Sequence, residues 1–173
     1  MDAGVDTGAI AYEVRVPIHQ DDTGLTLSAR CAREGLPLIE ELFAAAALDP
    51  AGIPRRLQVG ERRYYGREAP CGGRLDWTWP ASRIVNFVRA ADYLPFDSPW
   101  GHPRSTLPGR DVGIVKATRT LESSGEGPGV VGSPGGGGIR VSACDEWVFV
   151  QRMLVEGAYV DATDVVRPGD HLG

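Results

Sequence analysis

The chain has 173 residues, of which 42% are hydrophobic and 24% charged, enough for one medium-sized domain or two small ones. Its net charge is −5, and neither residues 1–65 (7 basic, 10 acidic) nor residues 66–173 (11 basic, 13 acidic) show the basic excess of a nucleic-acid binder. Three distant cysteines, Cys31, Cys71 and Cys144, predict neither a disulfide framework nor a metal site. No apolar run approaches the roughly 18 residues of a membrane span, so we expect a soluble, cytoplasmic protein with reduced thiols.

The N-terminal segment predicts a turn followed by a strand. Residues 2–8 are rich in glycine and aspartate, as tight turns are. Residues 9–18 then alternate between apolar and other side chains, which is the pattern of a half-buried strand. Such a strand needs a neighbour and an apolar layer beneath it, so we expect further structure to precede this segment.

Residues 25–47 predict a helix that begins after the capping side chains of residues 19–24. We expect a kink or a break into two helices at Gly35-Leu36-Pro37, because proline removes a helical hydrogen bond. The expected buried stripe consists of Ala32, Ile39, Leu42, Phe43 and Ala46. Residues 49–71 have the composition of a linker.

A second helix is predicted at the centre of the chain, after a short extended run at residues 74–77. Trp79-Pro80 is a suitable start, since proline is tolerated in the first helical turn. The apolar face of this helix comprises Ile84, Phe87, Val88 and Ala91. Prolines 95 and 99 then impose a rigid, aromatic loop before Gly101.

The remainder predicts an antiparallel sheet made of short strands and glycine-rich turns. We expect strands within residues 102–111, at 112–121, between the turns 123–129 and 133–138, at 139–143 and at 147–154, and one helical turn within 160–166. Residues 147–154 are apolar on both faces, which indicates a central strand. Together these elements favour an α+β fold with a small β-barrel led by one helix.

Few residues suggest chemistry by themselves. Asp6 lies in a glycine-bracketed turn, where a carboxylate orients a histidine or a water, although aspartates in such turns more often cap backbone N–H groups. The three histidines, His19, His102 and His171, are too far apart for a metal site and are interpreted as surface or loop residues. Gly135–Gly138 indicates a hairpin turn rather than a phosphate loop.

Segments in three regions of the chain, in order, resemble the 10-formyltetrahydrofolate-dependent formyltransferases, which include methionyl-tRNA formyltransferase and the N-formyltransferases of amino sugars and amino acids. Residues 2–10, Asp-Ala-Gly-Val-Asp-Thr-Gly-Ala-Ile, and Val-Pro-Ile-x-x-Asp-Asp-Thr at 16–23 resemble the end of the catalytic domain. Residues 72–90 resemble the entry to the C-terminal OB-like domain, and residues 161–173 resemble its end.

The resemblance implies a division into three parts. Residues 1–48 would be the C-terminal remnant of a Rossmann-like catalytic domain, residues 49–71 a linker, and residues 72–173 the OB-like domain. It also implies that Asp6 acts with a histidine and an asparagine that lie beside a Ser-Leu-Leu-Pro turn. This sequence has no Ser-Leu-Leu-Pro turn and therefore lacks the histidine and asparagine that go with it. We therefore expect an N-terminally truncated chain that is inactive on its own.

The implied reaction is formyl transfer from 10-formyltetrahydrofolate to the primary amine of a small biosynthetic substrate. Tyr93, Phe96 and Trp100 are the predicted substrate-binding residues, although aromatic residues after a helix are more often part of a core. Their loop departs from the shorter pattern of the tRNA enzymes, which favours an amino sugar nucleotide or a modified ornithine as acceptor. Alternatives are a fragment of methionyl-tRNA formyltransferase or a non-catalytic binding module. The expected protein partner is either a separate N-terminal fragment or, in a homo-oligomer, further copies of this chain.

Overall fold

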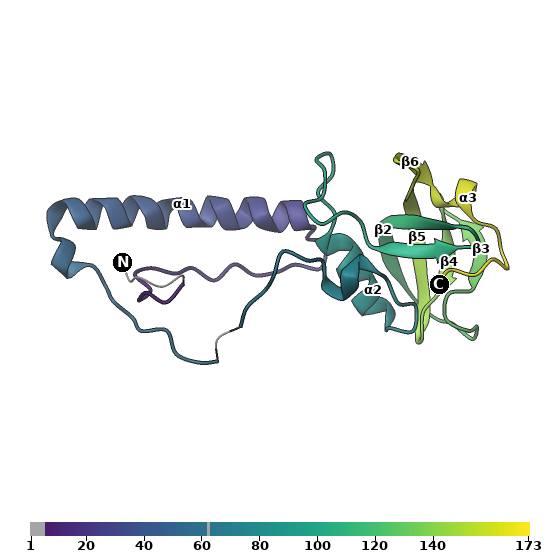
Figure 1. Cartoon of the computed structure of the whole chain (residues 1–173), viewed down its shortest axis with the longest axis horizontal. Helices are drawn as coiled ribbons and strands as arrows, with labels where there is room; N and C mark the ends of the chain where they lie inside the picture. The colour runs from purple at the N-terminus through teal and green to yellow at the C-terminus, as the bar shows by residue number, and fades with distance from the viewer. Residues whose placement is uncertain (1–5, 62) are drawn as a thin grey trace. The chain divides into compact units, whose positions relative to one another are not determined.

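The computed structural model describes residues 6–61 and 63–173, which form two compact units. The first comprises the described residues up to Asp21 together with Thr26–Gly66, and the second comprises Asp22–Leu25 and Arg67–Gly173. Of the turn predicted at residues 2–8, residues 2–5 lie outside the described residues. The elements are α1 (Gly24–Leu48), the 3₁₀ turns η1 (Pro50–Gly52) and η2 (Pro70–Gly73), α2 (Ala81–Ala90), β1 (Arg104–Leu107), β2 (Arg110–Ser123), β3 (Val131–Gly135), β4 (Gly138–Ser142), β5 (Glu146–Val155), β6 (Ala158–Asp161) and α3 (Ala162–Val165) (Figure 1).

The strand predicted at residues 9–18 does not form, so that prediction was wrong. Ile10 alone in this range makes a strand-like contact, a bridge in which the N–H groups of Ile10 and Arg56 each donate to the other's carbonyl, at 2.8 and 3.0 Å. Val14 and Ile18 are 46% and 66% exposed. Alternating side chains stabilise a strand only where a second strand runs beside it, and one bridge does not provide that.

The helix α1 is continuous, with Pro37 inside it, so the expected division into two helices is not found. The expected burial of its apolar stripe was also wrong, because α1 contains no buried residue. Ile39 is 50% exposed and Phe43 is 70% exposed. An amphipathic pattern specifies which face is apolar, but burial requires a second layer, and the described residues of the first unit provide none.

The second unit is built on an antiparallel sheet with the strand order β1-β2-β5-β4-β3 (Figure 1). β5 is central, as predicted from its apolar pattern: one edge pairs with β2, and the other pairs first with β4 and then with β6. The predicted helical turn near the C-terminus is α3, but the residues before it form β6. The core of this unit contains side chains from α2 and from every strand except β6.

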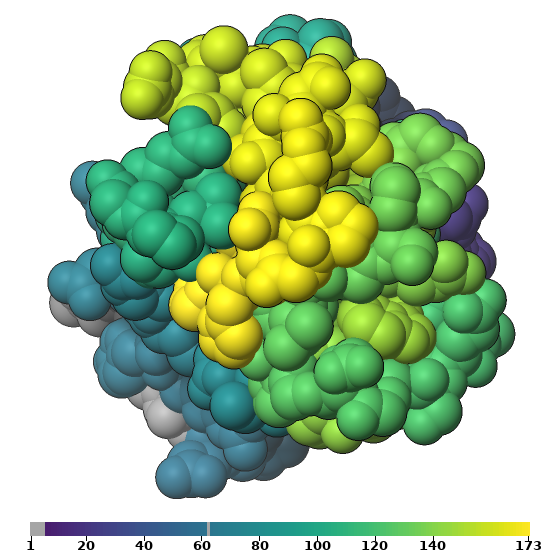
Figure 2. All heavy atoms as spheres, turned by 90° about the vertical axis from the view of Figure 1, so that its right-hand side faces the viewer, coloured from purple at the N-terminus to yellow at the C-terminus, as the bar shows by residue number. Residues whose placement is uncertain are grey.

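The C-terminal segment joins the two edge strands of this sheet. Next to β3, the N–H of Val131 donates to the carbonyl of Asp170 at 2.9 Å, and next to β1, Thr106 and Gly173 exchange two backbone hydrogen bonds of 2.8 and 2.9 Å. Leu172 between them is fully buried. In Figure 2 these yellow residues lie across the face of the unit between the teal and green segments. The segment therefore pairs edge groups that would otherwise be unpaired.

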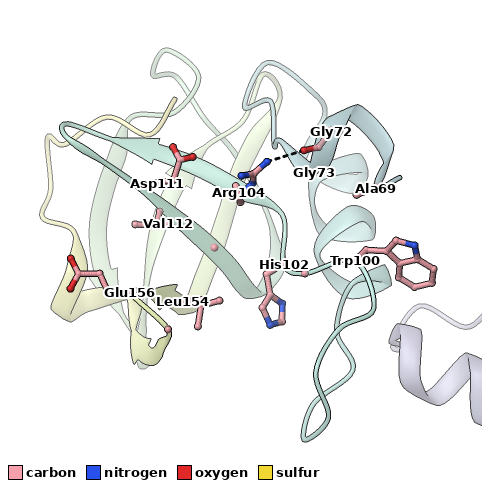
Figure 3. Close-up of a pocket in the computed structure, with 13 residues that line it drawn as sticks. Ala69, Gly72, Gly73, Trp100, His102, Arg104, Asp111, Val112, Leu154 and Glu156 are labelled. Carbon is pink, nitrogen blue, oxygen red and sulfur yellow. Dashed lines mark hydrogen bonds between the residues drawn. The ribbon is translucent and has the colours of Figure 1, made fainter. Parts of the chain in front are cut away.

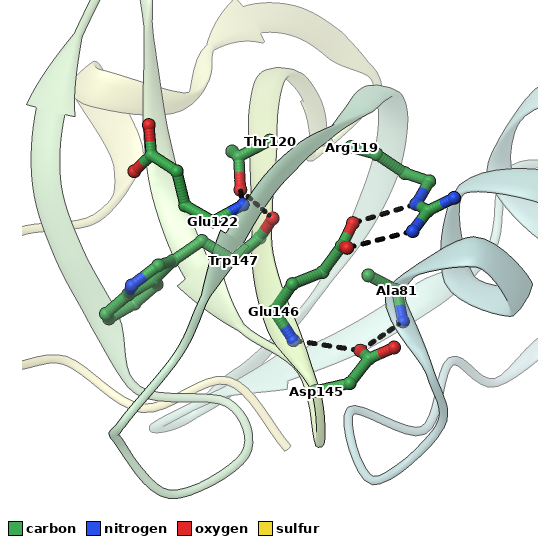
Figure 4. A network of polar contacts seen from close by, with 7 residues as sticks. All are labelled: Ala81, Arg119, Thr120, Glu122, Asp145, Glu146 and Trp147. Carbon is green, nitrogen blue, oxygen red and sulfur yellow. Dashed lines mark hydrogen bonds and ion pairs between the residues drawn. The ribbon is translucent and has the colours of Figure 1, made fainter.

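The apolar face predicted for the central helix is confirmed at Ile84, Val88 and Ala91, which are buried, whereas Phe87 is only half-buried. The turn between β4 and β5 holds the first turn of α2: the Asp145 carboxylate accepts from the N–H of Ala81 at 2.8 Å and from that of Glu146 at 2.9 Å (Figure 4). Such a carboxylate satisfies an N–H that the helix itself leaves unpaired. Beside it, Arg119 on β2 donates two hydrogen bonds, of 2.8 and 2.9 Å, to the Glu146 carboxylate.

The glycine-rich segment predicted as a hairpin turn joins β3 to β4. Gly136 and Gly137 have positive φ values of 55° and 82°, which suit glycine. Gly138 lies under an aromatic ring, since a Cβ there would lie 2.8 Å from the Phe149 ring and 2.5 Å from the Val150 carbonyl oxygen. These glycines therefore serve the turn and the close packing of β4 on β5.

Candidate functional site

The predicted substrate-binding residues lie in the loop that connects α2 to β1. Local hydrogen bonds order this loop: the Asp92 carboxylate accepts from the N–H of Leu94 at 3.1 Å, and the Tyr93 carbonyl accepts from the N–H of Phe96 at 2.8 Å. Further along, the Ser98 carbonyl accepts from the N–H of Gly101 at 3.2 Å. The loop therefore holds its aromatic side chains on an ordered backbone.

Two of the three aromatic residues meet. Tyr93 and Trp100 pack edge to face with ring centroids 5.9 Å apart, whereas Phe96 is 64% exposed. Gly24 packs closely against the Tyr93 ring, because a Cβ at Gly24 would lie 2.4 Å from that ring. Tyr93 and Trp100 thus form one surface, and the structure does not bring Phe96 to it.

Asp6 lies in the first unit, in a left-handed conformation with φ 55°. Gln58 spans this turn, since its Nε2 donates to the backbone carbonyls of Asp6 at 3.1 Å and Gly8 at 2.7 Å. The side chain of Asp6 is exposed. These contacts fix the backbone of the turn, and a catalytic role for its carboxylate stays a prediction.

A cavity of about 360 Å³, which we call the β1 cavity, opens beside the first strand of the sheet (Figure 3). It is formed by the η2 turn, the end of the aromatic loop, the starts of β1 and β2, and the hairpin between β5 and β6. Its lining combines charged, aromatic and aliphatic side chains with several glycines: Ala69, Gly72, Gly73, Trp100, Gly101, His102, Arg104, Asp111, Val112, Gly113, Leu154, Glu156 and Gly157. Such a mixture is typical of small-molecule sites.

His102 lies in the loop before β1, in keeping with the prediction of a surface or loop histidine, but it is buried in the wall of this cavity. Its side chain is only 9% exposed, and its Nε2 lies 3.2 Å from the Tyr159 hydroxyl. Nδ1 is buried without a hydrogen-bond partner in the described part of the chain. Burial lowers the pKa of the imidazole below its usual value, and the negative charge of Asp92 opposes this in part. The ring is therefore neutral at neutral pH.

Arg104 and Asp111 line the cavity near the η2 turn, and Arg74 pairs with Asp111. Arg74 donates to Thr106 at 3.0 Å and lies 3.4 Å from the Asp111 carboxylate. Arg104 donates to the Gly72 carbonyl at 3.1 Å. Sequence reasoning did not single out either arginine and gave His102 no role at a site, because no local motif marks these residues. The pairing of β1 with β2 brings Arg104 and Asp111 to one cavity.

Neither a metal centre nor a membrane helix can be assigned from the described residues. Residues 6–61 and 63–173 contain no cluster of three or more His, Cys, Asp or Glu side chains that could hold a metal ion. Over the same residues, no helix is both long enough and apolar enough to span a bilayer.

Comparison with known proteins identifies the family. The family described as formyl transferase, C-terminal domain, matches residues 69–167, which cover most of the second unit. The chain therefore belongs to the formyltransferase family, and its sheet with α2 is the C-terminal domain of that family.

Individual relatives agree with this assignment. The chain is 31% identical to a methionyl-tRNA formyltransferase of Pseudomonas putida over 159 residues, 91% of this chain and 48% of that enzyme. It is 38% identical to GDP-perosamine N-formyltransferase of Brucella melitensis over 96 residues, 56% of this chain and 36% of that enzyme. The chain thus spans about half the length, or less, of these relatives.

A solved structure shares the fold. HypX from Aquifex aeolicus, in complex with tetrahydrofolic acid, superposes with a TM-score of 0.60 over 95% of this chain and 28% of its own, at 17% sequence identity. At this identity the likeness concerns the fold alone.

Proposed function

We propose that this chain is part of an enzyme that transfers a formyl group from 10-formyltetrahydrofolate to the primary amine of a small biosynthetic molecule. The observation that carries the proposal is the family match over residues 69–167. The relative from Pseudomonas putida, whose match covers 91% of this chain, extends the likeness into the first unit. Both named relatives are formyltransferases.

In the proposed reaction, the amine of the acceptor attacks the formyl carbon, and an oxyanion develops on the formyl oxygen. Asp6 would hold a histidine and relay a proton, while that histidine and an asparagine stabilise the oxyanion. These two partners stand beside a Ser-Leu-Leu-Pro turn in the family, and this sequence has no such turn. We therefore propose that the 173 residues alone do not catalyse the transfer, and we assign no residue of this chain to the folate.

We further propose the finer fold that the family implies: residues 1–48 as the end of a Rossmann-like catalytic domain, residues 49–71 as a linker and residues 72–173 as an OB-like domain. The exposed apolar residues of α1 support this proposal, because Ile39, Phe43 and their neighbours have the pattern of a helix that packs on another layer. The C-terminal segment that joins the edge strands β1 and β3 supports a barrel-like closure.

The aromatic loop would select the acceptor. Tyr93 and Trp100 present a joint aromatic surface on an ordered backbone, and Phe96 adds an exposed ring in the same loop. Aromatic side chains suit the ring of a sugar or the base of a nucleotide. An amino sugar nucleotide is accordingly the acceptor that we favour.

One observation favours a second candidate, methionyl-tRNA as acceptor: a relative with that activity in its name matches 91% of the chain. Against it stands the balance of 11 basic and 13 acidic side chains in residues 66–173, which gives −2 where a tRNA binder needs a basic excess. A non-catalytic binding module is the third possibility.

The decisive experiment fuses this chain to the part of the Pseudomonas putida enzyme that precedes the matched segment, and measures release of tetrahydrofolate from 10-formyltetrahydrofolate. We expect no turnover by the chain alone, and turnover by the fusion with an amino sugar nucleotide. Asp6→Asn should lower that turnover by about a hundredfold or more, because it removes a group that relays a proton. Asp164→Asn, at an exposed position of α3, is the matched control.

Two results would redirect the proposal. Preference of the fusion for methionyl-tRNA over small amines would establish the second candidate. A folded fusion without turnover on any acceptor would support the binding module.

A further inference from the structure

Four residues around the start of α1 belong to the second unit. Asp22–Leu25 group with α2 and the sheet, whereas the rest of α1 groups with the first unit. The Arg89 guanidinium donates to the Asp22 carbonyl at 3.0 Å, and the N–H of Leu25 donates to the Asp92 carbonyl at 3.1 Å. Asp22 is only 5% exposed. These four residues, which we call the anchor, are therefore held at the end of α2 and the start of the aromatic loop.

Gly24 brings the anchor into close contact with Tyr93. A Cβ at Gly24 would lie 2.4 Å from the Tyr93 ring and 2.4 Å from the Ala90 carbonyl oxygen. Gly24 does not have a positive φ, so glycine serves here to provide space rather than an unusual backbone conformation. The Ala90 carbonyl is part of the α2 backbone. A side chain at position 24 would therefore displace the anchor or the Tyr93 ring.

Tyr93 passes this contact on to Trp100. Asp92 is bonded on two sides, because its carbonyl accepts from Leu25 of the anchor and its carboxylate accepts from the N–H of Leu94 at 3.1 Å. These bonds fix the backbone on either side of Tyr93. The Tyr93 ring packs edge to face with Trp100 at a centroid distance of 5.9 Å, and such pairs have a preferred geometry. The position of the anchor thus determines where both rings lie.

We propose that the anchor sets the acceptor specificity of the enzyme, with Gly24 as a positioning residue. Gly24 acts through Tyr93, whose ring it places in the joint aromatic surface with Trp100. This inference rests on the proposed function, in which that surface binds the acceptor. A displaced Tyr93 contacts the acceptor less well before and during the reaction alike, so KM rises while kcat changes little.

The first measurement uses the full 173-residue chain and does not depend on catalysis. NMR signals of the Tyr93 ring and the Trp100 indole are compared in the parent and in Gly24→Ala, and we expect both to shift because the added Cβ displaces the Tyr93 ring. Gly35→Ala in the same helix is the matched control. A Cβ there would meet no atom within 4 Å and its φ is not positive, so both signals should stay unchanged.

The second measurement uses the fusion with the N-terminal part of the Pseudomonas putida enzyme. Gly24→Ala should raise the KM for an amino sugar nucleotide about tenfold while kcat stays within about threefold of the parent. Gly35→Ala should change neither constant. Arg89→Gln removes the bond to the Asp22 carbonyl without adding a clashing atom. It should raise the same KM by a smaller factor, and it tests the anchor where Gly24→Ala does not fold.

A double variant tests the route of the effect. In a Tyr93→Ala background, Gly24→Ala should add little to KM, because the ring through which Gly24 acts is gone. An equal rise of KM with and without the Tyr93 ring would overturn the assignment of Gly24 to Tyr93.

Three further results would contradict the proposal. These are unchanged Tyr93 and Trp100 signals in folded Gly24→Ala, an unchanged KM for that variant in an active fusion, and a loss of kcat at constant KM. A parent fusion without turnover on any acceptor would instead reject the proposed function itself, and this failure is seen before any variant is compared.

Discussion

At the scale of single residues, His102 shows how burial changes the behaviour of a titratable group. Its imidazole is enclosed between the cavity wall and Tyr159, and Nδ1 has no partner in the described part of the chain. Burial lowers the pKa of the folded-state imidazole below the ordinary value of the unfolded chain. Between these two pKa values the unfolded state binds more protons, so acid favours unfolding there.

We therefore expect the free energy of unfolding to be highest above the ordinary histidine pKa of about 6.5 and to fall as the pH drops toward the folded-state value. His102→Gln, which cannot take up a proton, should reduce this loss between pH 8 and pH 5. Urea unfolding of the full chain at these pH values measures it. His171→Gln, at an exposed histidine, is the control and should leave the loss unchanged. An identical pH dependence in the parent and His102→Gln would contradict the assignment.

At the scale of elements, the hairpin of β3 and β4 depends on glycine for two different reasons. Gly136 and Gly137 supply positive φ, whereas Gly138 supplies room for the Phe149 ring and the Val150 carbonyl. The sequence predicts the turn, because a run of glycines between apolar segments is its usual signal. It does not distinguish these roles, since the need for room at Gly138 arises only when β4 pairs with β5.

Gly138→Ala should lower the free energy of unfolding by about 1–3 kcal/mol, as overpacking of a close contact does. Gly135→Ala in the same hairpin is the matched control, because a Cβ there would meet no atom within 4 Å and its φ is not positive. We expect the control to stay within about 0.5 kcal/mol of the parent. Thermal and urea unfolding measure both variants, and equal stability of the two would show that β4 yields without cost.

At the scale of the whole molecule, the two units differ in how much they bury. β5 has hydrogen-bonded neighbours along both edges, whereas α1 contains no buried residue. Helices without tertiary packing are marginally stable in water, and amides exchange fastest where buried contacts are few. The two units should therefore open independently of each other.

Hydrogen exchange of the full chain, followed by mass spectrometry, tests this expectation. Amides of residues 30–48 in α1 should exchange about a hundredfold faster or more than those of β5. Protection of α1 equal to that of β5 would show that another surface covers Ile39 and Phe43. A dilution series would then distinguish a second copy of the chain from a contact within it, because only the former loses protection on dilution.

The sequence by itself determined the features that depend on local periodicity. The apolar face of α2, the central position of β5 and the hairpin between β3 and β4 follow from side-chain spacing and turn residues, which act within a few positions of the chain. The aromatic loop was likewise bounded by its prolines. Motifs at three places in order indicated the formyltransferase family, and the family match over residues 69–167 confirms it.

Only the tertiary structure decided which of the periodic patterns form paired strands or buried helix faces, and which distant side chains come into contact. Residues 9–18 have the alternation of a strand, but in the described part of the chain they pair only through the bridge of Ile10 with Arg56. α1 has an apolar face, yet none of its residues is buried. Conversely, Arg104 and Asp111 carry no local signal, yet strand pairing places them at one cavity. Burial and convergence depend on contacts between distant parts of the chain, so no reading of neighbouring residues contains them.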